Sequence, residues 1–324
     1  MVKLASAEMA EKKLATRAAF GATLAELAEE GVPVVAVDAD LTGSTTTKKF
    51  AAAAPENADK LFNCGIAEQN MIDVAAGLAL TGHVAYTGSF AVFGTGRAYD
   101  QIRNTVCYSN LDVKICPTHA GVSVGPDGGS HQMLEDVSLM RGLPNMRVLV
   151  PADYAAARAA IKLAAKTPGP VYVRMGRAAV PCVYDDDVEL ELGRAYVLRE
   201  GADATVVACG VEIREALAAA DALAAEGISI EVIDAFSVKP LDEDTITASV
   251  AKTGCCVVAE EHSVHGGLGS AVAECLVRKN PAPCEFVGVE DRFGKSGEFE
   301  ELLGYFNLDA AAIANAAKRA MGRK

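Results

Sequence analysis

A length of 324 residues is typical of two domains rather than one. With 51% hydrophobic and 23% charged residues, the composition is that of a folded globular protein, which excludes an intrinsically disordered chain. The 43 acidic residues outnumber the 30 basic ones, and the resulting net charge of −13 disfavours binding to nucleic acid.

Strands and helices alternate along the first part of the chain. Strands are expected at 32–38, 84–87, 113–116, 147–150 and 171–174, and helices at 14–27, 68–80, 98–108 and 154–165. Apolar β-branched runs that alternate with alanine-rich helical patterns are typical of a parallel sheet covered on both faces. The segment 177–194 interrupts this rhythm with Pro181 and the run Asp185–Asp187, and it is interpreted as a linker that leads into a short edge strand.

The alternation then resumes. Strands are expected at 205–209, 229–234, 255–260 and 285–289, and helices at 213–226 and 268–277. The predicted fold class is therefore α/β, with two doubly wound domains over residues 1–190 and 191–324.

The sequence predicts no association with a membrane. The N-terminal residues are not followed by the apolar region of a signal peptide, and no window reaches the ~20 uninterrupted apolar residues that cross a bilayer. The nine cysteines are odd in number and scattered singly, which is typical of free thiols in a reducing compartment. No cysteine or histidine spacing indicates zinc. We expect a cytoplasmic protein with no metal ligands of its own.

Polar segments that follow strands are candidate sites, because ligands of doubly wound sheets bind beyond the carboxyl ends of the strands. One such segment places Glu68 in the first turn of a helix, where a carboxylate also complements the helix dipole without any further role. Another, Thr118–Gln132, gathers His119, Asp127 and His131 in a glycine-rich loop. These side chains offer proton transfer and hydrogen bonds to hydroxyls or phosphate.

Several segments, taken in order, resemble the transketolase family of thiamine-diphosphate enzymes. They are Leu14–Arg17, Asp38–Ser44, Gly65–Met71, Ser89–Phe93, His119–Gln132, Val173–Arg174, Val232–Leu241 and Glu260–Gly269. The resemblance implies a thiamine-diphosphate pyrimidine-binding domain followed by a transketolase C-terminal-like domain. It also implies transfer of a two-carbon ketol unit from a ketose phosphate to an aldose phosphate.

The resemblance assigns cofactor contacts to the first domain. Glu68 corresponds to the glutamate that protonates the aminopyrimidine ring of thiamine diphosphate, which allows that ring to remove the C2 proton of the thiazolium. A carboxylate in a water-poor site is suited to such a transfer. Phe90 and Phe93 correspond to the aromatic residues on which the pyrimidine stacks. Asp40 is expected beside the cofactor.

Substrate contacts are implied in the same way. The contacts with the phosphate end of the sugar are expected from Arg17, Ser44, His119 and Arg174. Guanidinium groups suit phosphate oxygens, so these arginines would form a local basic site that the net charge conceals. Asp127 and His131 correspond to residues that contact the hydroxyls near the reacting carbons. His131 is expected to move a proton as the C2–C3 bond breaks.

The sequence contains no GDG motif, through which the family's N-terminal half holds the diphosphate and Mg²⁺. The resemblance therefore implies the C-terminal subunit of a split transketolase. We expect a separate N-terminal subunit to hold the diphosphate and the Mg²⁺ (or Ca²⁺) in an α2β2 assembly. The chain alone is expected to be inactive.

Three alternatives remain open. A 1-deoxyxylulose-5-phosphate synthase shares the Asp-Gly-x-x-His-Gln pattern, but it has Arg where this chain has His119 and is usually one full-length polypeptide. A β subunit of a 2-oxo-acid dehydrogenase has a similar size and domain order, but its pattern fits Gly125–Gln132 poorly. A non-catalytic assembly subunit with the same fold would not need Glu68 or His131, and both are present.

Overall fold

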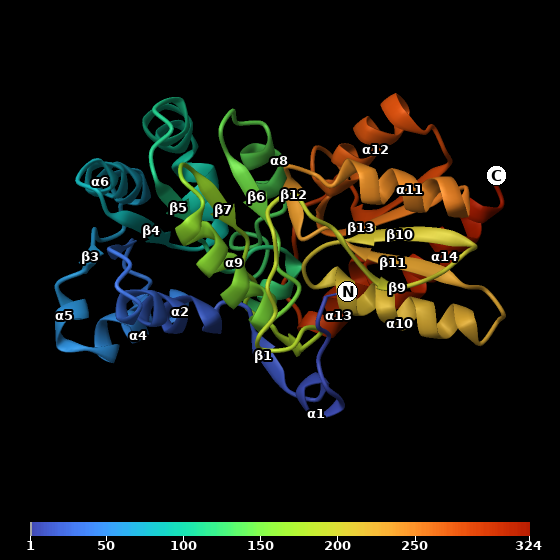
Figure 1. Cartoon of the computed structure of the whole chain (residues 1–324), viewed down its shortest axis with the longest axis horizontal. Helices are drawn as coiled ribbons and strands as arrows, with labels where there is room; N and C mark the ends of the chain where they lie inside the picture. Colours follow the sequence, from blue (N-terminus) through green and yellow to red (C-terminus); the bar gives the residue numbers. More distant parts are fainter. Residues whose placement is uncertain (1) are drawn as a thin grey trace.

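The computed structural model describes residues 2–324, which form two α/β domains that lie side by side (Figure 1). The first domain contains a seven-stranded sheet in the order β12-β6-β7-β5-β4-β2-β3, and the second a five-stranded sheet in the order β14-β13-β10-β11-β9. The predicted α/β fold with parallel sheets is confirmed.

The strands of the first sheet run parallel except for β12 at one edge. Its strands are β2 (Val34–Asp38), β3 (Leu61–Asn63), β4 (Val84–Gly88), β5 (Val113–Ile115), β6 (Arg147–Leu149), β7 (Val171–Val173) and β12 (Ser237–Lys239). The longer helices of this domain are α2 (Ala18–Glu29), α6 (Glu68–Leu80) and α9 (Tyr154–Lys166). Shorter helices are α1 (Ala7–Ala10), α3 (Thr42–Thr45), α4 (Thr47–Ala53), α5 (Pro55–Ala58) and α8 (Asp136–Arg141).

The second sheet is parallel except for its edge strand β9, which pairs antiparallel with β11. Its strands are β9 (Tyr196–Arg199), β10 (Ala204–Ala208), β11 (Ile230–Asp234), β13 (Cys256–Ser263) and β14 (Cys284–Val289). The helices are α10 (Glu212–Ala224), α11 (Glu243–Thr253), α12 (Leu268–Lys279), α13 (Phe299–Phe306) and α14 (Ala310–Met321).

Three features differ from the sequence-based expectation. Strand β12 comes from the second half of the chain but pairs antiparallel with β6 of the first sheet. A two-stranded ribbon joins β1 (Lys13–Ala15) to β8 (Ala179–Pro181), where a helical start and a linker were predicted. The helix predicted at 98–108 is a short α7 (Tyr99–Gln101) followed by the π-helical segment η2 (Ile102–Tyr108).

Two large hydrophobic clusters hold the molecule together, and each runs through both domains. One joins Phe20 and Tyr86 of the first domain to Val206 and Ile213 of the second. Because the apolar interior is continuous across the boundary, the two domains do not bury separate cores. Their contact is therefore expected to resist relative motion.

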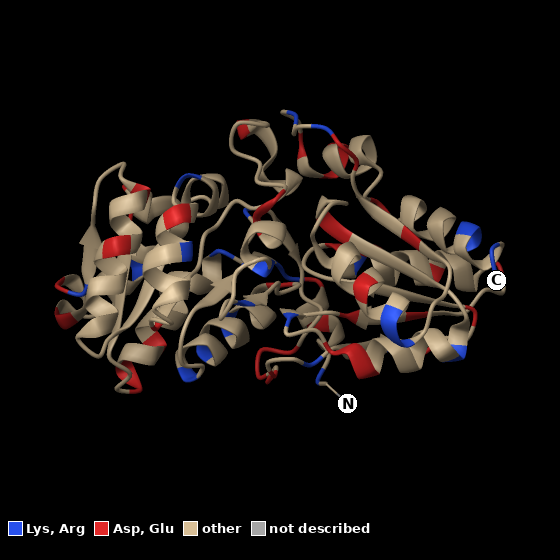
Figure 2. Ribbon diagram, turned by 90° about the horizontal axis from the view of Figure 1, so that it is seen from above, with Lys and Arg blue, Asp and Glu red and all other residues tan. Residues whose placement is uncertain are grey.

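The surface carries acidic and basic residues interspersed over both domains (Figure 2). Within residues 2–324, no helix is long and apolar enough to cross a membrane. All nine cysteines are free thiols, and most of them are buried.

Candidate active site

Glu68 is the first residue of α6 and only 3% exposed. Its carboxylate is neutralised by Arg97, whose Nη1 donates to both Oε1 and Oε2 at 2.9 Å. Arg97 ends the π-helical segment η1 (Val92–Arg97), and its side chain is 49% exposed. The helix N-terminus and the guanidinium both place positive charge beside this carboxylate. Arg97 was not predicted from the sequence.

The predicted aromatic residues lie together beside two histidines. Strands β4 and β5 pair in parallel, and the bridge between Phe90 and Thr118 continues that pairing beyond their ends. His119 therefore stacks on Phe90, with ring centroids 3.7 Å apart. Phe93 stacks on Phe90 with ring centroids 6.1 Å apart, and the Phe93 and His131 rings form a T-shaped pair with centroids 5.4 Å apart.

The arginine that forms this site's cation–π contact is the partner of Glu68. The Arg97 guanidinium lies 4.7 Å from the centroid of the Phe93 ring. The buried carboxylate and the aromatic faces are thus joined through one planar cation. This combination of an acceptor and an aromatic surface is suited to a flat nitrogen heterocycle.

His119 is a neutral imidazole in the folded protein. Burial lowers its pKa to about 3, and the positive charges of Arg17, Arg177 and His131 contribute further. Its Nδ1 lies 2.7 Å from Thr118 Oγ1. At neutral pH, therefore, His119 can offer a hydrogen bond to a ligand but no charge.

We expect His119 to make the folded protein less stable in acid. The unfolded chain takes up a proton on this imidazole near pH 6.5, whereas the folded chain does so only near pH 3. The stabilisation is therefore complete above pH 6.5 and is lost as the pH falls toward 3, with a slope of up to about 1.4 kcal/mol per pH unit. The free energy of unfolding of His119→Asn, measured from pH 7 to pH 4, should fall less steeply than that of the wild type. Parallel curves would contradict this assignment.

A pair of arginines forms a second part of the site. The Thr16 hydroxyl and the backbone of Gly176 join the two segments that carry Arg17 and Arg177, with Gly176 N donating to Thr16 Oγ1 at 2.7 Å. Burial lowers the pKa of Arg17, the charge of Arg177 lowers it further, and Asp127 opposes both effects. The backbone of Arg17 also donates to the Gly176 carbonyl oxygen at 3.4 Å, so the two arginines lie on directly adjoining segments. Two half-buried cations in such proximity suit an anion such as phosphate.

Of the other predicted residues, Ser44 and Asp127 lie near Arg17, whereas Asp40 contacts Asn63. Arg17 Nη1 donates to the Ser44 carbonyl oxygen at 2.8 Å, which brings the segment that follows β2 to the same place. Asp127 is exposed in the loop. Asp40 is exposed and has a positive φ of 65°, and its backbone N–H donates to Asn63 Oδ1 at 3.0 Å.

Arg174 does not reach this cluster, so its predicted contact with phosphate is corrected. It is 7% exposed, and its Nε donates to Asp136 Oδ2 at 2.7 Å while its Nη2 donates to the Glu261 carbonyl oxygen at 2.9 Å. Although burial opposes ionisation, the charge of Arg174 holds the pKa of Asp136 below its usual range. Arg177, three residues further along, lies instead on the segment that adjoins Arg17.

The described residues offer no metal centre of their own. Within residues 2–324, no group of three or more histidine, cysteine, aspartate or glutamate side chains is placed to hold a metal ion.

Comparisons with known proteins agree with this architecture. The family profile of the transketolase pyrimidine-binding domain matches residues 12–183, and that of the transketolase C-terminal domain matches residues 193–313. A putative transketolase C-terminal section of Methanocaldococcus jannaschii is 45% identical, with 92% of this chain and 93% of the relative aligned. A 6-deoxy-6-sulfo-D-fructose transketolase subunit of a Clostridium strain is 42% identical over 93% of this chain and 92% of that protein.

A solved structure is similar over nearly the whole length. It is described as a split-gene transketolase in an inactive β4 tetramer, and it is 48% identical to this chain. The TM-score is 0.87, with 96% of this chain and 99% of that chain covered.

Proposed function

The chain belongs to the transketolase family, and from that premise we propose that it is the C-terminal subunit of a two-subunit transketolase. It would transfer a two-carbon ketol unit from a ketose phosphate to an aldose phosphate, together with a separate N-terminal subunit. The observation that carries the proposal is the buried Glu68 carboxylate beside the aromatic pair Phe90 and Phe93. We place the boundary between the two domains near residue 190.

Thiamine diphosphate is the cofactor implied by the family, and the residues present fit its aminopyrimidine end. Glu68 would hold a proton at a ring nitrogen, and Phe90 and Phe93 would provide the apolar surface for the ring. When bound, the cofactor supplies the nucleophilic carbon to which the ketol unit is attached. We assign the diphosphate end and its Mg²⁺ (or Ca²⁺) to the N-terminal subunit.

For the substrate, we propose that Arg17 and Arg177 bind the phosphate end and that neutral His119 adds a hydrogen bond. Ser44 lies beside Arg17 and would contribute from the same side. Asp127 and His131 would contact the sugar hydroxyls, with His131 as the group that moves a proton when the C2–C3 bond breaks. Asp40 would lie at the outer edge of the cofactor site.

Exposed apolar residues support a partner surface next to Glu68. Ile66, two residues before Glu68, is 80% exposed, and Phe62 on the edge strand β3 is 37% exposed. An unpaired strand edge with exposed apolar side chains is a surface suited to a protein partner. The α2β2 assembly and the cytoplasmic location belong to this proposal.

The reaction type can be tested by substrate choice. We expect the chain mixed with its N-terminal subunit, thiamine diphosphate and Mg²⁺ to transfer ketol units between sugar phosphates. Pyruvate should not support condensation with an aldose phosphate, and branched-chain 2-oxo acids should not be decarboxylated. Turnover of either 2-oxo acid at a rate equal to or above ketol transfer would instead favour the synthase or dehydrogenase alternatives.

A further inference from the structure

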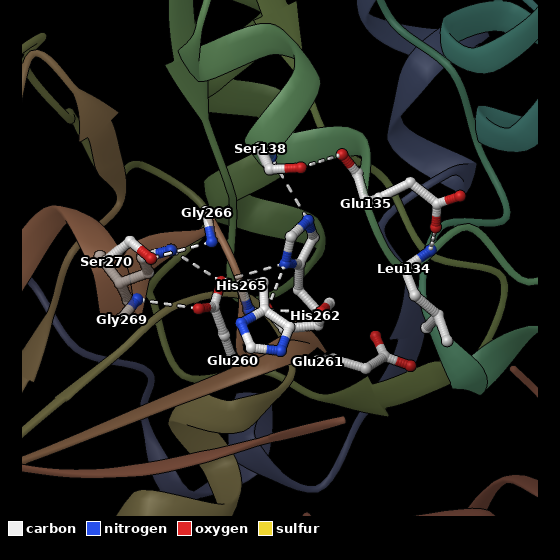
Figure 3. Close-up of polar contacts among 12 residues, drawn as sticks. Leu134, Glu135, Ser138, Glu260, Glu261, His262, His265, Gly266, Gly269 and Ser270 are labelled. Atoms are coloured by element: carbon white, nitrogen blue, oxygen red, sulfur yellow. Dashed lines mark hydrogen bonds and ion pairs between the residues drawn. The ribbon is translucent and has the colours of Figure 1, made fainter. Parts of the chain in front are cut away.

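The loop that carries the candidate substrate contacts is held by the second domain. This segment, Thr118–Gln132, is called here the substrate loop. On one side it packs against Gly294–Gly297, the strap between β14 and α13. On the other it packs against Glu261 of β13, which Figure 3 shows next to Glu260 and His262.

Gln132 at the end of the substrate loop binds the strap through its side-chain amide. Its Oε1 accepts from the Lys295 backbone N–H at 2.8 Å, and its Nε2 donates to the Lys295 carbonyl oxygen at 2.9 Å. The same Nε2 donates to the Val122 carbonyl oxygen at 3.1 Å, within the loop. Gln132 is only 4% exposed, so a lost partner would leave a buried polar group unsatisfied.

Glycines allow the strap and the loop to touch through their backbones. A Cβ added at Gly294 would overlap Gln132 Oε1. A Cβ added at Gly129 would lie 2.7 Å from the Gly294 carbonyl oxygen, closer than side-chain atoms can approach. Because there is no free space at this contact, a single added methyl group must displace the Gln132 side chain, the loop or the strap.

The opposite side of the loop is fixed by the buried Glu261 side chain of the second domain. Ser123 N donates to Glu261 Oε1, and a Cβ at Gly121 would overlap the Glu261 carboxylate. Arg174 holds Glu261 in turn, with 3.8 Å between Arg174 Nη1 and Glu261 Oε2. Arg174, which does not contact the arginine cluster, thus helps to hold Glu261 against the substrate loop.

We propose that Gln132 and Gly294 are positioning residues through which the second domain sets the geometry of the substrate loop. This inference rests on the proposed function for its kinetic consequence, since the loop carries His119, Asp127 and His131. Neither Gln132 nor Gly294 is assigned a contact with substrate. The second domain would thus govern substrate affinity without contributing a group to the reaction.

The test is Gly294→Ala in the full chain, compared with Gly304→Ala as the matched control. Gly304 lies in α13, and a Cβ there meets no atom closer than 3.9 Å. In the complex with the N-terminal subunit, Gly294→Ala should lower kcat/KM for the sugar phosphate about 10- to 100-fold, mainly through KM. The dissociation constant of thiamine diphosphate should stay unchanged. Gly304→Ala should leave both values at the wild-type level.

A double-mutant cycle separates positioning from a general loss of stability. In a Gln132→Ala background the overlapping Oε1 and Cδ are absent and only the Cβ of residue 132, at 3.0 Å, remains close to the added methyl group. Adding Gly294→Ala should therefore lower kcat/KM much less in this background than in the wild type. Equal effects of Gly294→Ala in both backgrounds, or an unchanged KM in the single variant, would overturn the proposal.

Hydrogen exchange of the chain alone supplies a measurement that does not depend on the reaction. Gly294→Ala should speed exchange of the amides of Val122–Asp127 about tenfold while the β10 and β11 amides keep their protection. Unchanged exchange in the loop would contradict the positioning role even in a protein that transfers no ketol unit. A wild-type complex without ketol transfer would instead contradict the proposed function alone.

Discussion

Glu68→Gln in the two-subunit enzyme is expected to lower kcat for ketol transfer by about 10² to 10⁴-fold. The amide keeps the shape of the side chain and can accept a hydrogen bond, but it cannot exchange a proton with the cofactor ring. The ketol-transfer rate at saturating thiamine diphosphate is the measurement. Sedimentation should show unchanged assembly with the N-terminal subunit, because the substitution is isosteric and Glu68 is only 3% exposed.

Glu56→Gln is the matched control for this substitution. Glu56 is exposed in α5 of the same domain, so its loss of charge should leave kcat at the wild-type level. If Glu68→Gln were as active as Glu56→Gln, Glu68 would have no part in the chemistry. The non-catalytic assembly subunit, which the sequence left open, would then be the better interpretation.

Arg177→Gln is expected to raise KM for the sugar phosphate roughly 10- to 100-fold with a smaller change in kcat. Loss of a charge-assisted hydrogen bond to phosphate costs about 1.5–3 kcal/mol, which corresponds to that range. The effect should shrink for a donor sugar that carries no phosphate. Steady-state kinetics with a phosphorylated and an unphosphorylated ketose is the measurement.

Arg174→Met is expected to lower the free energy of unfolding rather than weaken phosphate binding. Removal of the guanidinium leaves the Asp136 carboxylate buried without its partner, at a cost of about 3–5 kcal/mol in the free energy of unfolding. Arg177→Gln, at a half-buried position, should change this free energy far less. If Arg174→Met weakened phosphate binding selectively and left stability unchanged, the two arginines would have been assigned the wrong roles.

Most of the parallel strands could be predicted because they are short apolar runs, and residues buried on both faces of a sheet leave that pattern in the sequence. The edge strand β3 was not predicted, because its residues are only half-buried or exposed. All five residues of β2 and of β10 are buried. Strand β12 could not be assigned in this way, because its antiparallel pairing joins Ser237 to Leu149 in the other domain. A three-residue strand carries too little pattern to reveal such a distant partner.

In the candidate site, too, contacts between residues distant in sequence could not be predicted. Resemblance to the transketolase family, and not spacing alone, assigned Glu68, the aromatic pair and the loop histidines to one site. It could not distinguish Arg174 from Arg177, because the choice depends on Asp136, an ion-pair partner distant in sequence. Arg97 was missed for a similar reason, since its contact with Glu68 spans 29 positions.

Reconstitution tests the central claim most directly, namely that this chain supplies half of a shared active site. Ketol transfer would be measured for the purified chain alone, and again as the N-terminal subunit is added in the presence of thiamine diphosphate and Mg²⁺. We expect no activity from the chain alone and a rate that rises with added subunit until the two are equimolar. Robust ketol transfer by the chain alone, with no response to the second subunit, would contradict the account.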